Sequence, residues 1–257
     1  MVYVFGTSAC TMSSSENKAF VPGVWGPYFS AMVPGRWLSE SGQSAAGEAI
    51  AHLLKLHPSH DLFATEAEKS GQSLPDYLLT QLEKRVPSAS DAVHLANQIV
   101  VVPEFLGNRA PFADPKACAV ISGLDLSTDL DSLLALYVAG LFGLGYGLKQ
   151  ILDVQRDHDV CPDTVVISGG AGEHPIVKQL LADAAGIRIA RPDRRNLFCW
   201  GLQCLARLRA DLLDRLKTLC QQCSAWAMSL NLPPKQLHLR TQNSLLCFRP
   251  CNPQGAL

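Results

Sequence analysis

One stretch, from residue 164 to residue 184, constrains the fold more than any other part of this chain. Thr164–Ser168 is a short β-branched run typical of a buried strand, and Gly169 and Gly170 follow it directly. Two adjacent glycines permit a backbone path closed to other residues, and Pro175 suits the first turn of a helix. The sequence therefore predicts a strand, a tight glycine turn and a helix. Such a turn either contacts a nucleotide or only joins the two elements, because short glycine motifs also recur by chance.

A second glycine turn lies near the start of the sequence. Val2–Phe5 reads as a short strand that runs directly into Gly6-Thr7-Ser8. Hydroxyl groups in a glycine turn at the end of a strand can donate hydrogen bonds to a phosphate. A plain hairpin turn is the alternative, and it is the more common use of such residues.

The composition favours a soluble globular protein. The 257 residues are 47% hydrophobic and 18% charged, and the net charge of −1 gives no reason to expect binding to nucleic acid or to an anionic membrane surface. The longest uncharged apolar run, Leu133–Leu148, is shorter than the roughly 20 residues of a membrane span and is rich in glycine, so we predict a buried helix there. Met1–Phe5 lacks the features of a secretory signal.

Hydrophobic periodicity and capping residues predict the remaining elements. We expect helices over Gln43–Leu56, from an N-cap at Ser73 to about Arg85, and from a capping box at Thr128 and Asp131 to about Gln155. We expect strands in the later half of Ala92–Val102, over Ala119–Ile121 and over Ile187–Ala190. A helix that ends at Gly186 precedes the last of these strands, and His57–Ser73 is expected to be a variable loop. The segment Phe20–Trp37 is rich in Gly, Pro and aromatic residues, whose rings either face a sugar or partner or are half-buried.

Arg109 is a charged side chain inside otherwise apolar sequence. It is either a ligand for a phosphate or substrate, or a structural residue paired with Asp114. We favour the structural role.

Six short motifs follow one another along the chain: Gly6-Thr7-Ser8, Trp25-Gly26-Pro27-Tyr28, Gly42-Gln43-Ser44, Gly107-Asn108-Arg109 with Pro111, Ser122-Gly123-Leu124, and Gly169-Gly170 followed by Pro175. In this order they resemble the C-terminal domain of the FGGY carbohydrate kinases, and most closely the ribulokinase-like branch that phosphorylates pentuloses. The resemblance covers about Val2–Asp193. It implies an α/β fold of the actin-like ATPase (ribonuclease-H-like) type, in which two domains close on ATP and a sugar between them.

The resemblance also implies a site and a reaction. By similarity, Gly6, Thr7 and Ser8 face the ATP phosphates, and Gly169, Gly170 and Ala171 line the adenosine. This chain has Ala171-Gly172 where the family usually has another Gly or Thr. The implied cofactors are ATP and Mg²⁺, the implied substrate is a pentulose such as ribulose, and the implied location is the cytoplasm.

In the family, the sugar-binding N-terminal domain and the aspartate that acts as general base precede the Gly-Thr-Ser turn, which here begins at residue 6. We therefore expect a kinase fragment whose partner is the missing N-terminal domain, and which does not catalyse alone because a sugar hydroxyl needs a base within reach. The alternatives are a non-catalytic nucleotide- or partner-binding module and a defective gene product.

The last quarter of the chain differs in composition from the rest. Residues 195–257 contain eight Lys or Arg, two Asp and six of the nine cysteines. Moving the codon boundaries back by one nucleotide lets Phe198–Ala206 encode residues of the helix that follows the last strand in the family. We predict a kinase domain over residues 1–194 and a poorly ordered, out-of-frame tail over 195–257. Cys220, Cys223, Cys247 and Cys251 would otherwise suggest a zinc site, whereas the frame hypothesis explains the cysteines without a metal.

Overall fold

A computed structural model of the chain describes residues 1–96 and 98–190. The predicted tail over 195–257, its reading frame and its cysteines lie outside the described residues. The domain boundary at 194 therefore stays a prediction.

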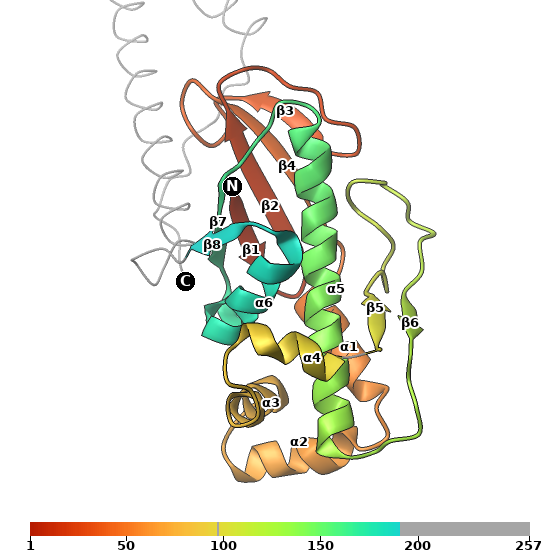
Figure 1. The fold of residues 1–257 in the computed structure, drawn as a ribbon. Coiled ribbons are helices and arrows are strands. Elements are labelled where there is room, and N and C mark those ends of the chain that lie inside the picture. Colours follow the sequence, from red (N-terminus) through yellow and green to blue (C-terminus); the bar gives the residue numbers. More distant parts are fainter. Residues whose placement is uncertain (97, 191–257) are drawn as a thin grey trace, which may run out of the picture. The chain divides into compact units, whose positions relative to one another are not determined.

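The centre of the fold is a mixed six-stranded sheet with strand order β3-β4-β2-β1-β7-β8 (Figure 1). Its strands are β1 (Val2–Phe5), β2 (Ala9–Ser15), β3 (Trp25–Phe29), β4 (Trp37–Gln43), β7 (Thr164–Ser168) and β8 (Arg188–Ala190). The strands β3, β4, β2 and β1 are antiparallel to one another in that order, whereas β7 runs parallel to both β1 and β8. The expected α/β fold is confirmed for the described part of the chain.

The helices and a small second sheet pack around a long central helix, α5. The helices are α1 (Gly47–Lys55), α2 (His60–Lys69), α3 (Leu74–Glu83), α4 (Val93–Ala96), α5 (Leu130–Arg156) and α6 (Pro175–Ala185), with 3-10 turns at Ser90–Ala92 and Gly170–Glu173. The second sheet pairs β5 (Val100–Val102) with β6 (Val120–Ser122). In Figure 1, α5 runs between the main sheet and this β5–β6 pair.

Helix α5 contributes many buried side chains to the hydrophobic core. It is long and apolar enough to cross a membrane, but 67% of its most apolar window is buried inside the protein, which confirms the predicted buried helix. A Cβ added at Gly145 would lie 2.5 Å from the Ala184 side chain, so the glycine lets α5 approach α6 closely. The glycines of this helix therefore serve packing, as their number in the sequence indicates.

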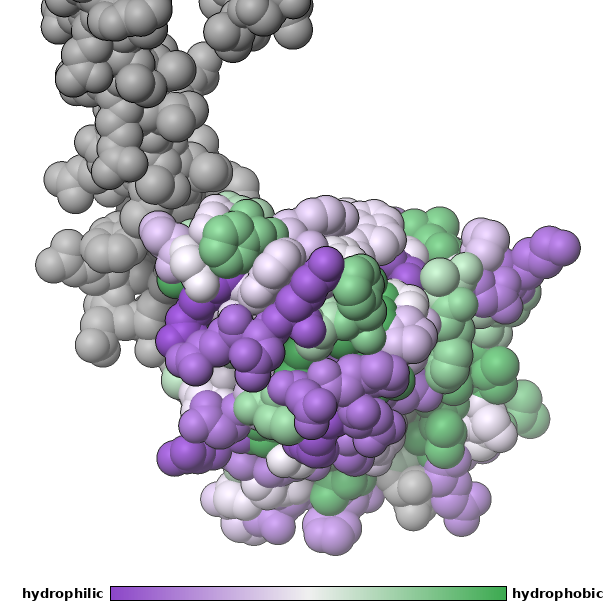
Figure 2. Space-filling view, turned by 90° about the horizontal axis from the view of Figure 1, so that it is seen from above, coloured by the Kyte–Doolittle hydropathy of each residue, from purple (hydrophilic) through white to green (hydrophobic). Residues whose placement is uncertain are grey.

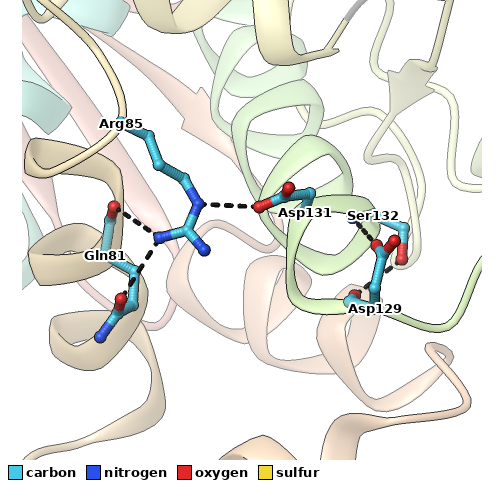
Figure 3. A network of polar contacts seen from close by, with 5 residues as sticks. All are labelled: Gln81, Arg85, Asp129, Asp131 and Ser132. Carbon is cyan, nitrogen blue, oxygen red and sulfur yellow. Dashed lines mark hydrogen bonds and ion pairs between the residues drawn. The ribbon is translucent and has the colours of Figure 1, made fainter.

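Three helix boundaries test the capping predictions. The Ser73 side chain accepts a hydrogen bond from Asp76 N at the start of α3, and Gly186 ends α6 with a left-handed φ of 64°, both as predicted. At the start of α5, the N-cap is Asp129 and not Thr128, because the Asp129 carboxylate accepts from Ser132 N. Arg85 Nε then bonds Asp131 Oδ1 at 2.7 Å, which joins α3 to the first turn of α5 (Figure 3).

Two predictions about helix positions are wrong. The expected loop over His57–Ser73 contains α2, a mostly polar helix in which only Phe63 and Ala67 are buried. The helix expected from Gln43 begins at Gly47, because Gln43 is the last residue of β4. Strands β2 and β4 were not predicted, since their buried positions carry small polar residues such as Thr11 and Ser41 in place of alternating apolar ones.

The β5–β6 pair has one covered and one open face. Val101 is buried, whereas Val100, Val102 and Val120 are exposed. Figure 2 shows hydrophobic residues gathered toward the right, the side on which β5 and β6 lie in Figure 1. The pair therefore covers part of the core with one face and leaves apolar side chains on the other.

Candidate functional site

The two predicted glycine turns meet at one edge of the main sheet. Strands β1 and β7 are parallel neighbours with Val4 opposite Ser168, so the turns that follow them leave the sheet at the same edge. A Cβ at Gly169 would stand 2.1 Å from Phe5 O, which means that the second turn lies directly against the end of β1. The carboxyl ends of parallel strands are the usual ligand-binding edge of an α/β sheet.

The turn Gly6-Thr7-Ser8 is the loop of a β1–β2 hairpin, because Phe5 pairs with Ala9. Its carbonyl groups are engaged by the start of α1: Ala46 N donates to Thr7 O at 2.8 Å and Gly47 N to Gly6 O at 2.9 Å. Thr7 and Ser8 are exposed, and no hydrogen bond joins either hydroxyl to another residue in the part of the chain that the structure describes. The hairpin interpretation is thus correct for the backbone, while the hydroxyls stay open to a ligand.

The second turn leaves open space beside Gly170. A Cβ at this position would meet no atom of the described residues within 4 Å, whereas one at Gly172 would stand 2.7 Å from the Ile167 side chain. Helix α6 starts with Pro175, which has no N–H, and the next backbone amide, Ile176 N, donates to the ring of His174 at 3.3 Å. The structure describes the backbone of Ala171 but not its side chain. Gly170 is therefore a position of this turn that is open to a ligand.

The motif Gly42-Gln43-Ser44 reaches the same edge of the sheet, and the sequence reasoning did not assign it to the site. Gln43 pairs with Ala9, and a Cβ at Gly42 would stand 2.0 Å from Ala9 O. The signal that could have found this segment is its place among the six motifs of the family resemblance. The chain continues from Ser44 to Ala46 and Gly47, whose amides hold the Gly6-Thr7-Ser8 turn.

A groove of about 790 Å³ runs along α6 and β8. It is lined by Thr164, Pro175, Lys178, Gln179, Ala182, Asp183, Gly186, Ile187, Arg188, Ile189 and Ala190. Its volume is in the range of small-molecule sites, and Pro175, at the start of α6, is part of its lining.

Arg109 has a structural environment, but its expected pairing with Asp114 is wrong. Its Nη2 lies 3.0 Å from Glu40 Oε1, its Nη1 donates to Cys10 Sγ at 3.3 Å, and its guanidinium lies 4.5 Å from the centre of the Trp25 ring. Trp25 pairs with Glu40 across β3 and β4, which places both on one face of the sheet. The partners of Arg109 are thus distant in sequence.

The described groups of the two turns suit the binding of an anion. Their described groups are backbone amides and the hydroxyls of Thr7 and Ser8, which can donate to anionic oxygens but do not act as bases at neutral pH. Within residues 1–96 and 98–190, no three His, Cys, Asp or Glu side chains gather in a way that could hold a metal ion. An anionic ligand fits these donors.

Comparison with known families agrees with this geometry. Residues 1–209 match the FGGY family of carbohydrate kinases, C-terminal domain. The chain belongs to this family, and the matched region contains both glycine turns.

Relatives in animals and yeast match only part of their own length. The FGGY carbohydrate kinase domain-containing protein of Xenopus laevis is 38% identical over 189 residues, which are 74% of this chain and 34% of the relative. The protein of the same name from Homo sapiens is 37% identical over 74% of this chain and 34% of its own. A D-ribulokinase of Saccharomyces cerevisiae is 32% identical over 74% of this chain and 27% of its own. The chain thus spans about a third of the length of these relatives.

Solved structures share the fold. A xylulose kinase from Rhodospirillum rubrum superimposes with a TM-score of 0.56 at 23% identity, covering 74% of this chain and 34% of that one. Plasmodium falciparum glycerol kinase with ADP gives a TM-score of 0.55 at 19% identity, covering 85% of this chain and 40% of that one. These similarities confirm the expected actin-like ATPase fold.

Proposed function

We propose that this chain is the ATP-side domain of a carbohydrate kinase, and that ATP binds across its two glycine turns. Gly6, Thr7 and Ser8 face the phosphates, while Gly169, Gly170 and Ala171 line the adenosine. The observation that carries the proposal is the meeting of the two turns at the carboxyl edge of β1 and β7. Anionic phosphate suits the free hydroxyls, and the open space at Gly170 lets a nucleoside approach the main chain. Mg²⁺ would arrive with ATP, held by its phosphates.

The substrate class that we propose is a pentulose such as ribulose. The names of relatives support it, since a D-ribulokinase is 32% identical to this chain and a ribulokinase of Staphylococcus saprophyticus is 30% identical. The sugar site and the general base would come from a second kinase domain, so that the chain alone binds nucleotide without phosphorylating sugar. A reducing, cytoplasmic location agrees with the free thiols of Cys10, Cys118 and Cys161.

Titration of ATP with Mg²⁺ into the chain tests the proposal, with calorimetry as the readout. We expect millimolar binding, because a second kinase domain would supply several charged hydrogen bonds to ATP that residues 1–190 do not offer, each worth about 1.5–3 kcal/mol. Gly170→Val should abolish binding, since its side chain would fill the space the nucleoside needs, and among the described residues a Cβ at this position meets no atom within 4 Å.

Ala31→Val is the matched control. It adds a branched side chain at an exposed residue of the β3–β4 connection, at the opposite end of β4 from Gln43. Unchanged binding in the control and lost binding in Gly170→Val support the site. Equal affinity in both variants would show that ATP does not bind at the glycine turn.

A further inference from the structure

A buried amide, that of Gln43, lies behind the Gly6-Thr7-Ser8 turn with both of its ends hydrogen-bonded. Gln43 is 9% exposed. Tyr3 Oη donates to its Oε1 at 2.8 Å, and its Nε2 donates to Leu144 O at 3.0 Å. One side chain at the end of β4 thus joins β1 to α5. We call these three residues the Gln43 clamp.

The surroundings fix the orientation of this amide. Tyr3 is fully buried, and burial raises the pKa of its hydroxyl far above the ordinary value, so the hydroxyl keeps its proton and acts as the donor. The oxygen of Gln43 must then face Tyr3, and its NH₂ group must face Leu144. A Cβ at Gly147 would stand 2.3 Å from Gln43 Nε2, so this glycine of α5 leaves the space that the amide occupies.

The clamp lies next to the contacts that shape the turn. Tyr3 precedes Gly6 by three residues on β1, and Gln43 precedes Ala46 by three residues on the path into α1. Ala46 N and Gly47 N are the donors to Thr7 O and Gly6 O. The clamp therefore holds β1 and the start of α1 against the same helix, at the point where the two segments meet.

We propose that Gln43 is a positioning residue for the Gly6-Thr7-Ser8 turn. Its amide sets the distance between β1 and the start of α1, and hence the place of the turn's amides and hydroxyls, without contacting the ligand. The functional meaning of this role rests on the proposed ATP site. The structural part, that the clamp holds the turn, can be tested without nucleotide.

The experiment compares Gln43→Leu with Gln155→Leu. Gln155 is the matched control because it is buried too, lies on α5 and accepts a hydrogen bond from Ser13 Oγ at 2.8 Å, so it also joins the sheet to this helix. Amide hydrogen exchange is measured at Ala46 and Gly47, with the buried Leu136 of α5 as the internal reference for global opening.

We expect Gln43→Leu to increase the exchange rates of the Ala46 and Gly47 amides at least tenfold more than that of the Leu136 amide. Gln155→Leu should change the exchange rates of all three amides by the same factor. Tyr3→Phe removes only the hydroxyl and should give the same pattern as Gln43→Leu, more weakly, which keeps the test valid if Gln43→Leu does not fold. Equal acceleration of the three amides in both clamp variants would overturn the proposal.

ATP affinity then tests the functional part. Gln43→Leu or Tyr3→Phe should weaken ATP binding about three- to tenfold, and Gln155→Leu should leave it unchanged. If the unmodified chain binds no ATP, the proposed nucleotide function fails, whereas the exchange rates still decide whether the clamp holds the turn. If exchange became faster only at Ala46 and Gly47 while the ATP affinity of the clamp variants stayed the same, Gln43 would not be a positioning residue for ATP binding.

Discussion

Adjacent glycines in the turn after β7 should respond in opposite ways to substitution by alanine. Gly169 has φ 109° and ψ 153°, a region of backbone conformation used almost only by glycine, so a side chain there costs about 1–3 kcal/mol. The new Cβ would also stand 2.1 Å from Phe5 O, and the backbone shift that relieves this clash costs about another 1–3 kcal/mol. We expect Gly169→Ala to lose about 2–6 kcal/mol of unfolding free energy.

Gly170→Ala should be neutral or stabilising. Within 4 Å, its Cβ would meet no atom of residues 1–96 or 98–190 whose side chains are described, and its φ is not positive. The substitution reduces the freedom of the unfolded chain, which stabilises a protein by about 0.4–1 kcal/mol when the native backbone allows it.

Urea unfolding followed by circular dichroism measures both differences, provided that the dependence on urea concentration stays the same in all variants. If Gly169→Ala changed the unfolding free energy by less than about 0.5 kcal/mol, the usual range for a surface substitution, the description of this turn would be refuted. The same conclusion would follow if Gly170→Ala were the less stable of the two variants.

Three further predictions concern the rest of the fold. Burial lowers the pKa of His57 in the folded protein, so neutral His57 stabilises the fold above the ordinary histidine pKa, and this stabilisation is lost as the pH falls toward the lowered pKa. The unfolding free energy measured in urea should therefore decline between pH 7.5 and about 5, and His57→Gln should make that decline smaller. Arg109→Met should cost about 1–2 kcal/mol because it leaves Glu40 half-buried without its partner, whereas Asp114→Asn should change the unfolding free energy much less. In a coupled assay, the chain with ATP, Mg²⁺ and D-ribulose should release no sugar-dependent ADP, and sustained release by the purified chain would contradict the need for a second domain.

The parts of the fold that follow from local signals were predictable. The β7 strand, its glycine turn and α6 were found because β-branched residues, paired glycines and a proline each favour one local conformation. The cap at Ser73 and the long α5 were found for the same reason. The convergence of the two turns was implied only by the family resemblance, since the pairing of β1 with β7 joins segments more than 160 residues apart.

The parts that depend on tertiary contacts were not predictable. Strands β2 and β4 have no apolar alternation because Thr11 and Ser41 are buried and bond each other across the two strands. Arg109 reaches Glu40, 69 residues away, and no local pattern distinguishes that partner from the nearby Asp114. Gln43 looks like the start of a helix by its periodicity, and only the fold reveals that its amide is held by Tyr3 and Leu144.

The most direct test of the proposed ATP site is an NMR titration with ATP and Mg²⁺ that follows individual backbone amides. The account predicts that Gly6, Thr7, Ser8 and Gly170 shift together along one binding curve, because both turns contact the same molecule. The amide of Leu126, a fully exposed residue that follows β6, should not move. Shifts confined to one turn, or absent from both while other residues move, would contradict a nucleotide site shared by the two turns.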